Sequence, residues 1–105
     1  MSKAAEYNER KEARRAERAR QAQRREKHMP FVSLLCKKYG ITLSSIPGGH
    51  QFRVNEYILN WWPGTNRIIV QYAGSNDTKE FRVDTDGEPK IVAAIRKLAR
   101  VTGRV

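Results

Sequence analysis

The stretch Tyr57–Tyr72 reads YILNWWPGTNRIIVQY, and it decides the fold of the chain. Two runs rich in Ile, Val, Tyr and Trp, Tyr57–Trp62 and Arg67–Tyr72, flank the turn-forming residues Pro63-Gly64-Thr65-Asn66. Enrichment in β-branched and aromatic residues, bounded by Pro, Gly and Asn, is typical of a strand–turn–strand unit. The stretch therefore predicts an antiparallel hairpin that offers a docking surface to the rest of the chain.

The two faces of this hairpin both carry large apolar side chains. Side chains alternate between the faces of a strand. In the first strand one face holds Tyr57, Leu59 and Trp61, and the other holds Ile58, Asn60 and Trp62. We therefore expect both faces to be at least partly covered.

Two further strands and one weaker one are predicted around the hairpin. His50–Val54 places Phe52 and Val54 on one face, and Lys79–Val83 places Phe81 and Val83 inward. Ile41–Ile46 reads as a weak strand or an extended segment.

Amphipathic helices are predicted before and after these strands. Pro30–Tyr39 ends at Gly40, a residue that commonly stops helices, and Pro89–Thr102 ends at Gly103. The apolar face of the first helix is predicted as Phe31, Leu34, Leu35 and Tyr39, with Val32 and Cys36 beside it, and that of the second as Ile91, Val92, Ile95, Leu98 and Ala99.

The N-terminal segment, residues 2–28, differs in composition from the remainder: SKAAEYNERKEARRAERARQAQRREKH. It contains no Gly or Pro and favours a continuous helix of about 40 Å, with Ser2 as a possible N-cap and Pro30 marking its end. We therefore predict an Arg-rich helical extension (1–29) and a compact α+β domain (30–105). The expected fold is a small antiparallel sheet of three to four strands packed with two helices, preceded by a long basic N-terminal helix.

The charge of the chain is strongly positive. Its 105 residues include 21 Lys and Arg against 11 Asp and Glu, which gives a net charge of +10 and a pI near 10.3. Small soluble domains commonly carry a net charge of magnitude roughly 2–8. The excess favours a polyanionic partner, most simply nucleic acid, and the alternative is that the charge serves solubility alone.

Arginines gather on one side of the predicted N-terminal helix. At about 100° per residue, four of them fall within a sector of about 80°, with Lys11 and Arg15 beside them. A phosphate backbone along that side would relieve their mutual repulsion and release counterions. The alternative is a solvated helix or a disordered tail. The four arginines are Arg10, Arg14, Arg18 and Arg25.

A second basic surface is expected on the C-terminal helix. No acidic residue interrupts this surface along the helix. The alternative interpretation is an ordinary solvent-facing side with no binding role. Its predicted nucleic-acid contacts are Arg96, Lys97 and Arg100.

The run of residues 10–25, RKEARRAERARQAQRR, resembles the arginine-rich RNA-binding helix of lambdoid phage antitermination proteins. The closest matches are Arg14-Arg15-Ala16-Glu17 and Gln21-Ala22-Gln23. The resemblance implies a helix that folds onto a small RNA hairpin while an aromatic side chain stacks on a loop base. At that stacking position this chain has Ala22 or Arg24, depending on the alignment.

The segment from Phe31 to about Ile69 is similar to small uncharacterised bacteriophage proteins that carry an aromatic–Trp–Pro–Ser/Gly–Thr–Gly–basic hairpin. Here it comprises a helix, then HQFRV, then NWWPGTNRI. Asn66 stands where that pattern has Gly, and Asn tolerates the left-handed conformation that the turn requires. The resemblance implies a viral origin and a host-cell cytoplasmic location, and it names no activity.

The residue types that carry catalysis or bind metal are sparse. Cys36 is the single cysteine, which predicts a buried core thiol in a reducing cytoplasm. His28 and His50 are far apart in sequence, so no metal site is expected. Asp84–Glu88 resembles the start of a calcium loop but lacks the downstream ligands, and acids before a helix stabilise its dipole. We expect no enzyme activity, cofactor or small-molecule substrate, and no apolar run reaches the roughly 20 residues of a membrane span.

Two functions remain open on the sequence. The first is a non-enzymatic nucleic-acid-binding protein, with RNA slightly preferred over DNA. The second is a phage inhibitor, such as an anti-CRISPR or another anti-defence or host-takeover factor, that blocks the nucleic-acid site of a host protein complex. Trp61 and Trp62 are either core residues or, on a basic sheet, platforms on which bases stack.

Overall fold

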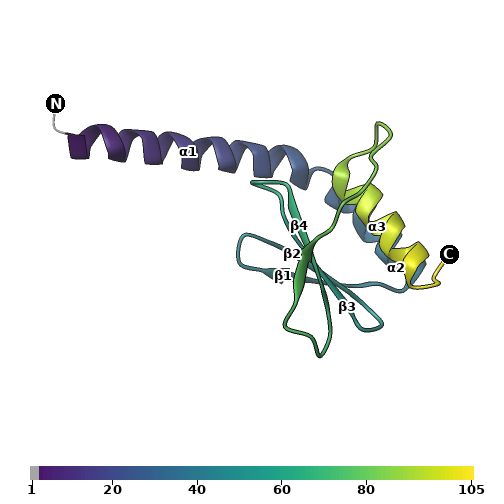
Figure 1. Cartoon of the computed structure of the whole chain (residues 1–105). Coiled ribbons are helices and arrows are strands. Elements are labelled where there is room, and N and C mark those ends of the chain that lie inside the picture. Colours follow the sequence, from purple (N-terminus) through teal and green to yellow (C-terminus); the bar gives the residue numbers. More distant parts are fainter. Residues whose placement is uncertain (1–2) are drawn as a thin grey trace.

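The computed structural model describes residues 3–105 and shows a long helix beside a five-stranded antiparallel sheet packed with two helices (Figure 1). The predicted N-cap Ser2 lies outside the described residues. The strands follow one another across the sheet in chain order, β1-β2-β3-β4-β5. The elements are α1 (Lys3–Glu26), α2 (Met29–Tyr39), β1 (Thr42–Ile46), β2 (Gly49–Val54), β3 (Tyr57–Trp62), β4 (Arg67–Tyr72), β5 (Thr78–Glu80) and α3 (Lys90–Val101).

The predicted hairpin is confirmed as β3 and β4. Their register pairs Tyr57 with Tyr72 at one end and Trp62 with Arg67 at the other, which leaves the four predicted residues in the turn. Asn66 has φ 59° in that turn, the left-handed conformation that Asn tolerates. Its Oδ1 also accepts the indole N–H of Trp61 at 3.0 Å, so this buried donor is satisfied.

The sheet has more strands than the three to four predicted. The weakly predicted segment Ile41–Ile46 contains β1, which pairs with β2 along its whole length and so overcomes its modest strand propensity. The predicted strand Lys79–Val83 is shorter, because regular pairing ends at Glu80. Phe81 is nevertheless buried and Val83 packs against the core, as the alternation predicted.

The core lies between one face of the sheet and the helices α2 and α3. Phe52, Leu59, Trp61 and Ile68 have no exposed surface, and the predicted apolar face of α3 is buried against them. Each such side chain contributes roughly 1.5–3 kcal/mol to folding. The opposite face of β3, with Ile58, Asn60 and Trp62, is partly buried, so the expectation that both faces of this strand are at least partly covered is confirmed.

The predicted apolar face of α2 is wrong at two positions. Phe31 and Leu34 are 47% and 63% exposed, whereas the buried residues of the helix are Val32, Leu35, Cys36 and Tyr39. Both sets have helical spacing. The stripe that starts at Val32 is apolar over two turns, whereas the stripe through Phe31 and Leu34 continues to Lys38, and tertiary packing selects the longer one.

Helix α1 projects beyond the rest of the molecule (Figure 1). The chain measures 58 × 30 × 24 Å and has a radius of gyration of 16.2 Å. A compact chain of this length would have a radius of gyration of about 13 Å. The N-terminal part of α1 is therefore a rod that stands in solvent.

Candidate nucleic-acid interface

Helix α1 is held to the domain near its C-terminal end. Arg25 Nη1 donates hydrogen bonds to the carbonyl oxygens of Pro63 at 2.7 Å and Gly64 at 3.3 Å, both in the β3–β4 turn. Glu26 Oε1 lies 2.6 Å from Nε2 of His50, at the start of β2. The turn also lies close to the helix backbone, since a Cβ on Gly64 would be 3.4 Å from Arg18 O. These contacts fix the direction in which the rod leaves the domain.

The rest of α1 is largely exposed. The helix has no buried residue, in agreement with a sequence that offers almost no large apolar side chain to bury. Within residues 3–105, no ion pair or side-chain hydrogen bond engages five of the predicted contacts, and all five are exposed. These five residues, here called the free cations, are Arg10, Lys11, Arg14, Arg15 and Arg18.

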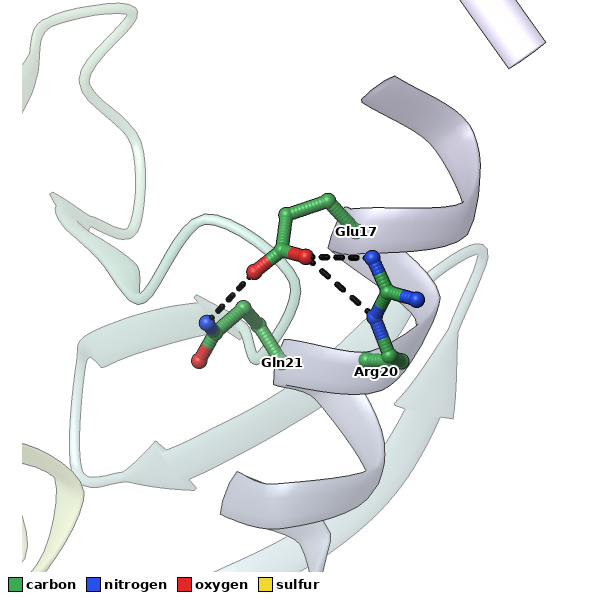
Figure 2. A network of polar contacts seen from close by, with 3 residues as sticks. All are labelled: Glu17, Arg20 and Gln21. Atoms are coloured by element: carbon green, nitrogen blue, oxygen red, sulfur yellow. Dashed lines mark hydrogen bonds and ion pairs between the residues drawn. The ribbon is translucent and has the colours of Figure 1, made fainter. Parts of the chain in front are cut away.

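The acid–base network around Glu17 on α1 leaves the free cations unneutralised. Figure 2 shows Glu17 with Arg20 and Gln21, one turn further along the helix. Arg20 Nη2 donates to Glu17 Oε2 at 2.6 Å, and Gln21 Nε2 donates to Glu17 Oε1 at 2.9 Å. The hydrogen bonds from Gln21 and Arg20 lower the pKa of the Glu17 carboxyl below its ordinary value. The carboxylate of Glu17, which precedes Arg18 in the sequence, is thus directed toward other partners.

Arg25 has a different role from the other predicted contacts of α1. It shares their side of the helix, but its guanidinium is partly buried against the turn carbonyls. The structure therefore separates the predicted arginine face into an anchor, Arg25, and the free cations that precede it.

The predicted basic surface on α3 is largely engaged within the domain. Arg96 Nε lies 3.0 Å from Glu88 Oε1, so an acid from the preceding loop interrupts this surface even though none does along the helix. Lys97 Nζ donates to Arg82 O at 2.6 Å and lies 4.8 Å from the centre of the Phe81 ring. Arg100 is exposed. Helix α3 lies on the opposite side of the molecule from the free end of α1, so the structure does not bring the two predicted surfaces together (Figure 1).

The two adjacent tryptophans have different environments. Trp61 is fully buried in the core and stacks on His50, with ring centres 5.7 Å apart. Trp62 lies on the other face of β3 and is only partly buried. It lines a pocket of about 530 Å³ in the corner between α1 and the sheet, together with Arg18, Gly48, Gly64, Thr65 and Arg67. Alternation along the strand predicted that the pair would be separated, but not that α1 would close the corner.

Other kinds of functional site have little support among the residues that the structure describes. Among residues 3–105, no group of three or more His, Cys, Asp or Glu side chains is placed to hold a metal ion. Cys36 is buried, and burial raises the pKa of its thiol to about 11, which opposes a role as a nucleophile. None of the helices in residues 3–105 combines the length and apolar character that crossing a membrane requires.

Comparisons with models of known families, with curated proteins and with solved structures found no match.

Proposed function

We propose that this chain is a non-enzymatic nucleic-acid-binding protein whose helix α1 lies along a phosphate backbone. The observation that carries the proposal is the set of free cations on a rod with no buried residue. Like charges held on a rigid helix repel one another, and phosphates would remove that repulsion while releasing condensed counterions.

The spacing along the rod supports this proposal. Arg10, Arg14 and Arg18 are successive i,i+4 neighbours, so their Cα atoms rise by about 6 Å per step. Duplex nucleic acid carries a charge about every 1.7 Å of its axis. Each of the three arginines can therefore reach a phosphate without bending the helix. The resemblance of residues 10–25 to arginine-rich RNA-binding helices leads us to rank RNA ahead of DNA.

The salt dependence of affinity tests this proposal. The full chain is titrated against a labelled RNA hairpin and a labelled DNA duplex, with fluorescence anisotropy as the readout, from 50 to 300 mM salt. Contacts from five cations predict a log–log slope of about −4.5 on duplex DNA and about −3.5 where the phosphates are single-stranded. Affinity that is independent of salt, or no binding at the lowest salt, contradicts the proposal.

A second candidate is a protein that docks on a partner protein and blocks its nucleic-acid site. The observation that favours it is the exposed pair Phe31 and Leu34 on α2. These apolar side chains cannot contact phosphates favourably, whereas they could pack against a partner protein. A pull-down from nuclease-treated host lysate separates the two candidates. A stoichiometric protein partner that survives nuclease and is lost in a Leu34→Glu variant supports the second. Loss of all partners after nuclease supports the first.

A further inference from the structure

We infer that the corner between α1 and the open face of the sheet binds one unpaired nucleotide, with its base stacked on Trp62 and its phosphate near Arg18 and Arg67. This inference rests on the proposed function and adds to it the class of nucleic acid, namely one with an unpaired base.

The position of the Trp62 ring is set by the turn that precedes β2. A Cβ on Gly49 would lie 3.2 Å from Trp62 Cδ1, and a Cβ on Gly48 would lie 3.8 Å from the same atom. One edge of the indole therefore rests against these two glycines, and a side chain at Gly49 would crowd the ring. An aromatic ring packed along one edge and open to a pocket is a preorganised stacking surface.

The chemistry around the ring is that of a nucleotide site. The pocket of about 530 Å³ is lined by two arginines, one from α1 and one from β4, and by no acidic residue. Its volume falls in the range of roughly 300–1,000 Å³ that is usual for small-ligand sites. An apolar ring between two cations complements a base linked to a phosphate, whereas an apolar peptide would leave both guanidinium groups without partners.

The surface of α1 that leads to the corner is positively charged, which favours a nucleic acid. Arg14 precedes Arg18 by one helical turn, and both are exposed and free of partners within residues 3–105. A backbone that follows α1 toward the domain therefore arrives at Trp62. Bases of a continuous duplex are stacked on one another, so only an unpaired base can place its face on the indole.

The affinity of Trp62 variants for three probes tests the inference. The full chain is titrated with a 15-nucleotide oligo(U), an oligo(dT) of the same length and a 15-base-pair DNA duplex. Loss of stacking in Trp62→Leu is expected to weaken single-strand binding by about tenfold and to leave duplex binding unchanged. Trp62→Phe keeps an aromatic face and should retain most of the affinity. Tyr72→Leu, which removes an exposed aromatic at the far end of the same hairpin, is the matched control and should bind as the original chain does.

Tryptophan fluorescence gives an independent readout. Because Trp61 is fully buried, we expect single-stranded probes to quench Trp62 alone, and the quenching to disappear in Trp62→Phe. This holds even where Trp62→Leu fails to fold. A stronger response to oligo(U) than to oligo(dT) assigns the site to RNA, and the reverse assigns it to DNA.

Two results overturn the inference in different ways. If Trp62→Leu binds every probe as the original chain does, and no quenching is seen, the corner is not a nucleotide site although the salt-dependent binding of α1 stands. If no probe binds the full chain, the inference and the proposed function both fail.

Discussion

Single residues decide how the hairpin and the helix meet. Gly49 has no room for a side chain, because a Cβ there would lie 2.2 Å from Trp61 O. Asn66 does two tasks in one turn, since its left-handed backbone closes the hairpin and its side chain accepts the Trp61 N–H. Arg25 ties α1 to the same turn. The direction of the rod therefore depends on a few contacts around one four-residue connection.

At the residue scale, we predict that Cys36 is unreactive in the folded protein. Burial raises the pKa of its thiol from 9.0 to about 11, so at pH 8 the thiolate is about a hundredfold less populated than in the unfolded chain. Labelling with a thiol-specific disulfide reagent should be slow in the native state and complete in urea. The same shift makes folding less favourable as the pH rises above 9, because the unfolded thiol ionises first. Rapid stoichiometric labelling of native protein would contradict the burial of this thiol.

Individual residues also show what could be predicted from sequence and what could not. The left-handed turn at Asn66 and the core position of Cys36 follow from residue type. The exposure of Phe31 does not, because two overlapping stripes on α2 satisfy helical spacing and only tertiary packing chooses between them. The anchoring role of Arg25 could not be predicted from the sequence either, since its hydrogen-bond acceptors are backbone oxygens 38 and 39 residues away.

At the scale of elements, the central hairpin and the C-terminal helix were predictable because local signals agree. β3 and β4 have both strand-forming residues and a turn between them, and α3 buries its whole predicted apolar face. The polar strand β1 was underestimated, since its stability comes from pairing with β2, whereas β5 was predicted to extend beyond Glu80, where its pairing ends. The docking of α1 had no local signal at all, because the helix has no apolar stripe.

We predict that Arg25→Ala loosens α1 without unfolding the domain. The guanidinium donates to two turn carbonyls, and a hydrogen bond from a charged group stabilises by roughly 1.5–3 kcal/mol. Partial exposure reduces this toward the lower value, so amide hydrogen exchange in residues 18–26 should accelerate by about tenfold.

Arg14→Ala is the control for that measurement, because Arg14 has the same charge and no partner within residues 3–105. Amides in the sheet should exchange at the same rate in both variants. Equal protection of residues 18–26 in Arg25→Ala and the original chain would mean that other contacts, such as that of Glu26 with His50, suffice to hold the helix.

At the scale of the whole molecule, the chain is a charged rod attached to a small α+β body. Residues 1–29 carry 10 basic and 5 acidic residues. The acids of α1 lie outside the sector of about 80° that contains Arg10, Arg14 and Arg18. That sector leads to the corner with Trp62. Net charge was visible in the composition, but the alignment of the rod with the open face of the sheet exists only in the folded chain.

We predict that the position of charge on α1, not its amount, governs binding. Two variants with the same loss of charge separate these possibilities. The first is Arg10→Gln, Arg14→Gln and Arg18→Gln, which removes three free cations. The second is Arg20→Gln, Arg24→Gln and Lys27→Gln; at about 100° per residue Arg20 and Arg24 lie outside the sector of Arg10, Arg14 and Arg18, and Lys27 directly follows α1. Arg25 is left in place in both because it anchors the helix.

The salt dependence of affinity for a labelled RNA hairpin and a labelled DNA duplex is measured for these two variants and the original chain. This measurement decides whether one face of α1 binds phosphates. The first variant should lower the magnitude of the log–log slope by about 2 to 3, since each lost phosphate contact removes roughly 0.7–0.9. The second should lower it by less than about 1. Equal effects of the two variants, or no effect of either, would contradict a phosphate-binding face on α1.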